Sequence, residues 1–135
     1  MEIFGRLKPN IGCIHDRNNE DVLVSVIKYS LKKSKQARWY FSFSISGVAK
    51  RKFFANIDYF QLGIENNKIY FIPATKTTGY KLSQPQKNSS IYLARFPIIR
   101  EMQKFQPNNY CGYYMLEFDQ DSKYWYIDKN HKIKA

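Results

Sequence analysis

Cys13, His15 and Asp16 form the one cluster of reactive side chains that the sequence places close together. A cysteine thiol becomes a nucleophile when a nearby histidine takes its proton. Residues i and i+2 of an extended strand share a face, so the thiol of Cys13 and the imidazole of His15 could meet. Catalysis would also need an oxyanion donor and a group that orients the histidine, and this Gly-, Pro- and Asn-containing loop specifies neither. We therefore predict that the protein is not an enzyme, and a small enzyme using Cys13 and His15 is the least favoured alternative.

Metal and cofactor sites are not expected either. A site built from Cys13, His15 and His131 lacks the spacing of a zinc site, and two cysteines in the whole chain make no zinc or disulfide framework. The six glycines are scattered and form no phosphate-binding loop. Asp119 and Asp121 are too few ligands for calcium, and a turn is the expected role of these carboxylates.

The charge balance is the strongest functional signal in the sequence. Lys and Arg number 22 against 11 Asp and Glu, which gives a formal net charge of +11. A domain with this excess attracts polyanions and repels copies of itself. We therefore expect DNA or RNA as the partner. An even spread of cations that only keeps the protein dissolved is the alternative.

The cations gather in clusters that alternate with aromatic residues. Seven of them, in two clusters, are the candidate nucleic-acid-binding residues: Lys32, Lys33, Lys35, Arg38, Lys50, Arg51 and Lys52. A third cluster contains Lys76, Lys81 and Lys87. Lys and Arg neutralise phosphates without reading sequence, whereas an exposed aromatic side chain such as Trp39 can stack on a base. The alternative role of each cluster is to solvate a helix face or a loop.

The elements that would carry these clusters are mostly strands. Hydrophobic residues make up 44% of the chain and aromatic residues 17%, a composition typical of half-buried pleated surfaces. Residues 22–29 are β-branched and apolar, and residues 39–45 alternate with Trp39, Phe41, Phe43 and Ile45 on one face. We expect these two strands to form a hairpin with a basic tip.

The rest of the chain suggests an internal repeat. Ser46 can cap a helix over residues 47–54, and a hairpin follows with strands at 57–64 and 69–72 around an Asn-rich turn. After a polar loop with a short strand at 80–82, the same order returns as a strand at 91–96, a helix at 98–105 that starts after Pro97, and a hairpin with strands at 113–118 and 123–127.

The predicted fold class is therefore α+β and mostly β. Antiparallel strands form two β-α-β-β units with two short helices. We expect one domain over residues 1–135, with repeat units at 39–73 and 91–127. Chance similarity between aromatic hairpins of equal length is the alternative to a duplication.

The segment from residue 43 to 74 resembles the AbrB-like swapped-hairpin domain of bacterial transition-state regulators and antitoxins. The resemblance rests on a strand at 44–46, a short polar helix at 49–53, a strand at 58–64, and an Asn-containing turn with a final strand over 66–73 that ends in Pro. In the second unit, residues 96–100 are similar to the strand-to-helix junction of that family. Its members work as dimers of single units, so the resemblance implies DNA binding and a homodimer or a fused pseudo-dimer.

The location and the alternatives for function follow from what the sequence lacks. The N-terminus has no apolar stretch of the signal-peptide kind, and no segment approaches the ~20 apolar residues of a membrane span. We expect a protein of the bacterial host cytoplasm with no membrane partner. The favoured function is a DNA-binding regulator or a phage or mobile-element accessory protein. The alternative is an anti-defence inhibitor of the anti-CRISPR type that binds a host nuclease or another nucleic-acid-processing protein.

Overall fold

The computed structural model describes residues 21–30, 37–86 and 90–133, and these form two antiparallel sheets. The first sheet has the order β6-β2-β1-β7 and contains β1 (Asp21–Ser30), β2 (Ala37–Ser46), β6 (Ile91–Pro97) and β7 (Gly112–Met115). The second has the order β5-β3-β4-β9-β8 and contains β3 (Tyr59–Glu65), β4 (Lys68–Pro73), β5 (Tyr80–Lys81), β8 (Glu117–Phe118) and β9 (Trp125–Asp128). The predicted fold class, mostly antiparallel β, is confirmed.

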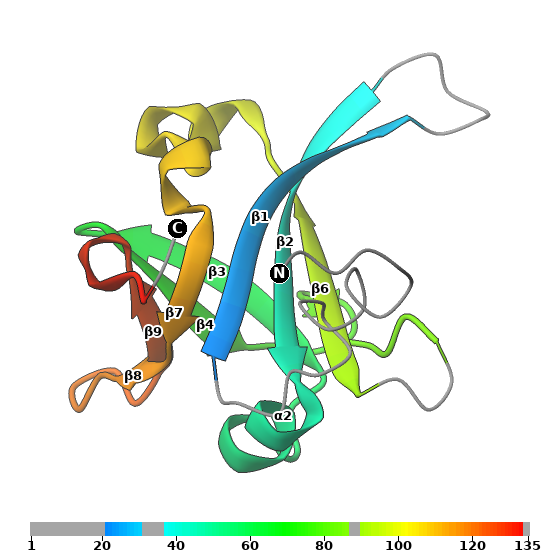
Figure 1. Ribbon diagram of the computed structural model, residues 1–135, viewed down its shortest axis with the longest axis vertical. Coiled ribbons are helices and arrows are strands. Elements are labelled where there is room, and N and C mark those ends of the chain that lie inside the picture. Colours follow the sequence, from blue (N-terminus) through cyan, green and yellow to red (C-terminus); the bar gives the residue numbers. More distant parts are fainter. Residues whose placement is uncertain (1–20, 31–36, 87–89, 134–135) are drawn as a thin grey trace, which may run out of the picture.

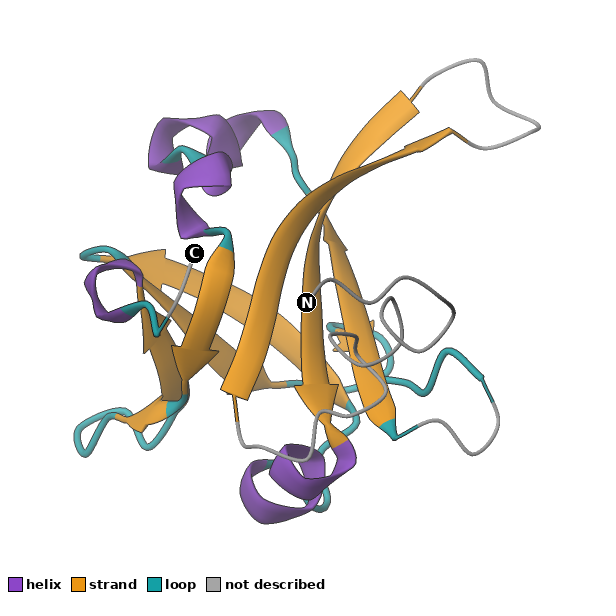
Figure 2. Cartoon of the chain, in the orientation of Figure 1, coloured by secondary structure: helices purple, strands orange, loops and turns teal. Residues whose placement is uncertain are grey.

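The described residues also form short helices. They are α2 (Gly47–Phe53), η2 (Arg100–Phe105), η3 (Pro107–Tyr110) and η4 (Lys129–His131), of which the last three are 3₁₀ helices. Figure 2 shows α2 at one end of the molecule and the coil of η2 and η3 at the other. Within the described ranges, no helix has the length and apolar character needed to cross a membrane.

The two sheets are joined at both edges. At each edge, one stretch of chain pairs first with a strand of one sheet and, a few residues later, with a strand of the other. On one side, β7 pairs with β1 up to Met115, and β8 begins two residues later and pairs with β9. On the other side, β5 pairs with β3, and Ser83 just beyond it pairs with Leu93 of β6. Strands that switch sheets in this way form the corners of a closed sandwich.

Aromatic rings fill the space between the sheets. Phe43 of the first sheet is 1% exposed, and its ring centroid lies 5.1 Å from that of Phe71 in the second sheet and 5.6 Å from that of Phe96 in β6. Phe60 of β3 packs on Phe54, which follows α2, at 4.8 Å. Edge-to-face contacts of this kind add to the hydrophobic stabilisation of burial. Aromatic packing between the sheets therefore explains much of the unusual composition.

Two local features confirm the sequence-based predictions. The Ser46 hydroxyl caps α2 by accepting a hydrogen bond from the amide of Ala49 at 3.0 Å. Asn66 and Asn67 have φ values of 51° and 65° and join β3 to β4 in a two-residue turn. Asparagine tolerates this left-handed backbone, which a hairpin turn of this length requires.

The second predicted unit differs from the first. Pro97 ends strand β6 instead of opening a helix, since the next amide, that of Ile98, donates to the carbonyl of Trp39 at 2.8 Å. The helix begins later, at Arg100, and is 3₁₀ rather than α. The strand expected at 113–118 is interrupted at Leu116, so that only β8 pairs with β9. The order of elements is as predicted, and the duplication itself stays a prediction.

The β1–β2 hairpin is confirmed, and it extends beyond the sheet. Val24 is the last residue of β1 that pairs with β7, and Tyr40 is the first residue of β2 that pairs with β6. Beyond these points, residues 28–30 and 37–39 pair with each other and with no third strand in the described part of the chain, and the carbonyl of Trp39 also accepts a hydrogen bond from the amide of Ile98. We call these two stretches the arm, and Figure 1 shows it projecting from the body of the protein.

Candidate nucleic-acid interface

Four of the seven predicted contact residues belong to the arm and its tip. The backbone of Arg38 lies in β2 and pairs with Tyr29. The side chain of Arg38 and the whole of Lys32, Lys33 and Lys35 lie outside the described residues. The structure thus places the strands that lead to this cluster, and the cations themselves remain a sequence-based prediction.

The Lys50 side chain is buried, so the prediction that it faces water beside Arg51 and Lys52 is wrong, and its contact with nucleic acid stays a prediction that burial does not favour. The residue is 7% exposed, and its Nζ donates to the carbonyl of Phe54 at 2.7 Å and lies 3.4 Å from a carboxylate oxygen of Asp58. Its ammonium group also lies 5.7 Å from the centre of the Tyr92 ring. A helix turns about 100° per residue, so three consecutive residues spread over about 200° of its circumference, and one of them can lie on the inner face. Lys50 instead occupies the inner face and satisfies a carbonyl at the C-terminal end of α2.

Arg51 and Lys52 are exposed, as predicted, at the last turn of α2. The ammonium group of Lys52 lies 5.3 Å from the centre of the Phe53 ring. Figure 1 places α2 at the end of the molecule opposite to the arm. The described strands of the arm and the second predicted cluster thus lie at opposite ends of the molecule.

One residue of the third cluster lines a basic pocket. Lys81 of β5 and Arg95 of β6 are both exposed and line a hollow of about 470 Å³ together with Tyr80, Pro85 and Leu93. Lys76 is exposed in the loop before β5, whereas Lys87 lies outside the described residues. The sequence analysis did not identify Tyr80 or Arg95 as contact residues. Tyr80 could have been identified, because it is an aromatic residue within a polar loop that contains lysines.

An apolar groove lies on the other side of Tyr80. The groove has a volume of about 530 Å³, and its walls include Leu62, Tyr80, Pro97, Ile99, Met102 and Phe105. Ile99 is 54% exposed and Tyr80 is 48% exposed. Tyr80 therefore forms the boundary between the basic pocket and the apolar groove.

A further aromatic surface lies at the base of the arm. Trp39 shares the face of β2 that holds Phe41 and Phe43, yet it is 47% exposed. It pairs with Lys28 in the arm, beyond the pairing of β2 with β6, and it lines a shallow pocket with Ile98 and Pro107. The prediction of one aromatic face is thus confirmed, whereas Trp39 stands outside the core.

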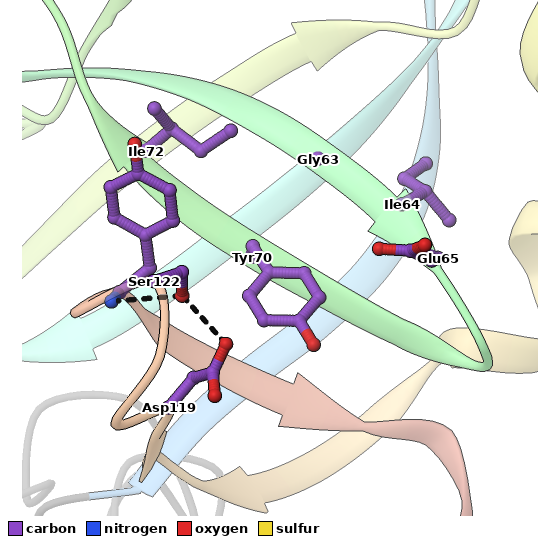
Figure 3. Close-up of a pocket in the computed structure, with 8 residues that line it drawn as sticks. Gly63, Ile64, Glu65, Tyr70, Ile72, Asp119 and Ser122 are labelled. Atoms are coloured by element: carbon purple, nitrogen blue, oxygen red, sulfur yellow. Dashed lines mark hydrogen bonds between the residues drawn. The ribbon is translucent and has the colours of Figure 1, made fainter.

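A fourth hollow, on the outer face of the second sheet, has the opposite electrostatic character. Figure 3 shows it: Gly63 and Tyr70 line a space of about 400 Å³ with Glu65 and Asp119. The Ser122 hydroxyl donates to Asp119 at 2.7 Å, and this hydrogen bond holds the pKa of the Asp119 carboxyl below its usual value. The described lining of this hollow contains two carboxylates and no Lys or Arg, so the hollow itself offers phosphate no cationic contact. The amide of Asp121 also donates to Asp119, which confirms the predicted turn role.

The predicted cluster of reactive side chains and the possibility of a metal site can be compared with the structure only in part. Cys13, His15 and Asp16 lie outside it. Among the described residues, no group of three or more His, Cys, Asp and Glu side chains could hold a metal ion. Comparison with known proteins found no matching family model, no similar curated protein and no similar solved structure, so the AbrB-like resemblance stays a prediction.

Proposed function

We propose that this protein binds nucleic acid, with the arm as its principal contact, and acts as a DNA-binding regulator or a phage or mobile-element accessory protein. The observation that carries the proposal is the projection of a two-stranded arm beyond the sheet that supports it. The major groove of B-DNA admits a two-stranded β-ribbon. The arm is therefore the element of this fold whose shape suits insertion into a duplex.

The charge of the arm supports the same proposal. Residues 28–38 contain five cations and no acidic residue: Lys28, Lys32, Lys33, Lys35 and Arg38. Each cation that neutralises a phosphate releases a counterion, which gives affinity that depends steeply on salt. Lysines on edge strands can have a different role, which is to prevent those strands from pairing with other chains. The test must therefore distinguish cations that bind phosphate from cations that only protect a strand edge.

The test is a salt titration of binding to a labelled DNA duplex. The wild-type protein should show a linear fall of log K with log salt concentration. Replacing Lys32, Lys33 and Lys35 with Gln should reduce the slope by roughly 2 to 3, because each phosphate contact contributes about 0.9. A matched control replaces Lys123 in the β8–β9 turn, Lys129 in η4 and Lys132 just after η4, and should leave the slope nearly unchanged. Absence of duplex or single-strand binding at low ionic strength would refute the proposal.

A protein target is the second candidate function, favoured by the exposed apolar side chains beside the arm. Trp39 is 47% exposed and Ile99 is 54% exposed. Large aromatic side chains of this kind carry much of the energy of protein interfaces. An anti-defence inhibitor would use them to cover the nucleic-acid site of a host nuclease. Capture of a protein from nuclease-treated bacterial lysate, lost on Trp39→Ala, would support this function over the first.

The proposed setting is the bacterial cytoplasm. If the chain works as AbrB-like domains do, it forms a homodimer whose two arms contact neighbouring parts of one duplex. Light scattering of the protein with and without duplex DNA distinguishes a dimer from a monomer.

A further inference from the structure

We propose that Tyr80 is the anchor of a site for single-stranded nucleic acid, in which one unpaired base stacks on Tyr80 over the apolar groove while neighbouring phosphates contact Lys81 and Arg95. This inference rests on the proposed function and specifies the form of nucleic acid that this part of the surface takes. The site is separate from the arm.

The Tyr80 side chain packs on a buried ring on one side and is exposed to solvent on the other. Its ring centroid lies 5.1 Å from that of Phe96, which is buried, and the two rings meet edge to face at 64°. The residue is nevertheless 48% exposed. An aromatic ring that is fixed by a buried neighbour and open on the other side provides a stacking platform without losing mobility on binding.

The backbone around Tyr80 is also fixed. Tyr80 pairs with Phe60 of β3, and the amide of Gly79 donates to the carbonyl of Thr75 at 2.9 Å. Gly79 packs so closely that a Cβ atom there would lie 2.6 Å from Cβ of Ala74 and 2.9 Å from the carbonyl oxygen of Phe60. The turn that presents Tyr80 is thus closely packed against β3, and it positions the ring before any ligand binds.

The groove beside the ring has the size and lining of a site for a planar heterocycle. Its volume of about 530 Å³ lies within the range of roughly 300–1,000 Å³ for small-ligand sites. Leu62, Met102 and Phe105 give it apolar walls. Gln61 also lines it, and its side-chain amide can hydrogen-bond to the edge of a base, whereas the hydroxyl of Thr78 is engaged by Thr75.

Cations lie on both sides of the groove. Lys81 and Arg95 line the basic pocket that shares Tyr80 as a wall. On the other side, η2 carries Arg100 and Lys104, both exposed, against one acidic residue, Glu101. An apolar groove with cations at its rims is complementary to a ligand that alternates bases with phosphates. An uncharged peptide segment lacks this complementary charge.

The geometry favours single strands over duplexes. Within a duplex the faces of the bases are covered by their stacked neighbours, and only their edges reach the grooves. A ring such as Tyr80 can therefore stack on a base only when the base is unpaired. Binding of this kind tolerates many sequences, because every base presents a π-face.

The experiment compares a labelled oligothymidylate of about ten nucleotides with a duplex in the same buffer, by fluorescence anisotropy. Tyr80→Ala should weaken single-strand binding roughly 5- to 100-fold, whereas Tyr80→Phe should retain it, because stacking needs the ring and not the hydroxyl. Duplex binding through the arm should change little. Tyr124→Ala, which removes a half-buried tyrosine from the acidic hollow, is the matched control and should bind as the wild type does.

Two further measurements keep the outcome unambiguous. Lys81→Gln combined with Arg95→Gln should lower the salt slope for the oligothymidylate by about 1.4, with the thermal midpoint of each variant checked alongside. If Tyr80→Ala binds single strands as the wild type does, while the arm variant loses duplex binding, the inference is overturned and the proposed function stands. If neither nucleic acid binds at low salt, both are overturned. Binding of an apolar peptide at the groove in preference to the oligonucleotide would also overturn the inference.

Discussion

Lys50 acts as a structural residue although its neighbours in the sequence are surface cations. Its Nζ donates to the carbonyl of Phe54 and lies 3.4 Å from Asp58. Lys50→Ala should destabilise the protein by about 1–3 kcal/mol, because a buried carbonyl loses a charged donor. Arg51→Ala, one residue further along and exposed, should change stability by less than about 0.5 kcal/mol. Urea denaturation of both variants measures the difference. A Lys50→Ala variant of full stability but weaker nucleic-acid binding would contradict this assignment.

His131 provides a contact that depends on pH. Its Nδ1 lies 2.9 Å from Glu117 Oε2 and 3.7 Å from Asp128 Oδ2. The hydrogen bond to Glu117 and the charges of Asp128 and Glu117 raise the pKa of His131 above 6.5. A raised pKa in the folded state means that the contact stabilises the protein fully below pH 6.5 and that this stabilisation disappears as pH rises through the folded-state value.

The corresponding prediction is a stability difference that changes with pH. Wild-type protein should be more stable than His131→Gln in mildly acidic buffer, and the two should converge in mildly alkaline buffer. Urea midpoints measured across this range give the difference directly. A gap that stays constant with pH would show that His131 contributes packing rather than charge.

At the scale of elements, the arm is separable from the body of the protein. Lys28 and Trp39 face each other across the hairpin, so an Asn-Gly turn in place of residues 29–38 would join them in register. The shortened protein should fold with nearly unchanged thermal stability, because residues 29, 30, 37 and 38 pair only within the arm. It should lose duplex binding and keep single-strand binding at Tyr80. Loss of cooperative unfolding would show instead that the arm supports the core.

The elements also show which features a sequence reveals. Ser46, Asn66 and Asn67 act on backbone within a few residues of themselves, so the helix cap and the hairpin turn could be predicted. The break at Leu116 could not, because an alternating aromatic segment does not reveal whether its partner is the nearby β9 or the distant β1. The same limit applies to the site. Tyr80 and Arg95 line one pocket only because β5 and β6 lie next to each other in the closed sandwich.

At the scale of the whole molecule, Phe43 links the two sheets. Its ring packs on Phe41, Phe71 and Phe96 and is 1% exposed. Phe43→Ala should cost about 3–5 kcal/mol, since a cavity replaces the ring. That loss is a large part of the ~5–15 kcal/mol that stabilises a typical domain. Trp39→Ala, on the same face but half exposed, should cost far less. Chemical denaturation of both variants tests whether the core is shared by the two sheets.

The excess of cations should make folding and binding respond to salt in opposite directions. With a formal net charge of +11, like charges repel one another in the folded chain, and added salt screens that repulsion. Raising sodium chloride from about 0.05 to about 0.3 M should therefore increase the thermal midpoint, while it weakens nucleic-acid binding because each released counterion gains less entropy in the more concentrated salt. The variant with Gln at positions 32, 33 and 35, which removes three of the 22 cations, should gain less stability from salt. Calorimetry and anisotropy in the same buffers measure the two responses. A midpoint that falls with salt would mean that attractive ion pairs such as Lys50 with Asp58 outweigh the repulsion, and the cations would then be dispersed among acids rather than held in excess for a polyanion.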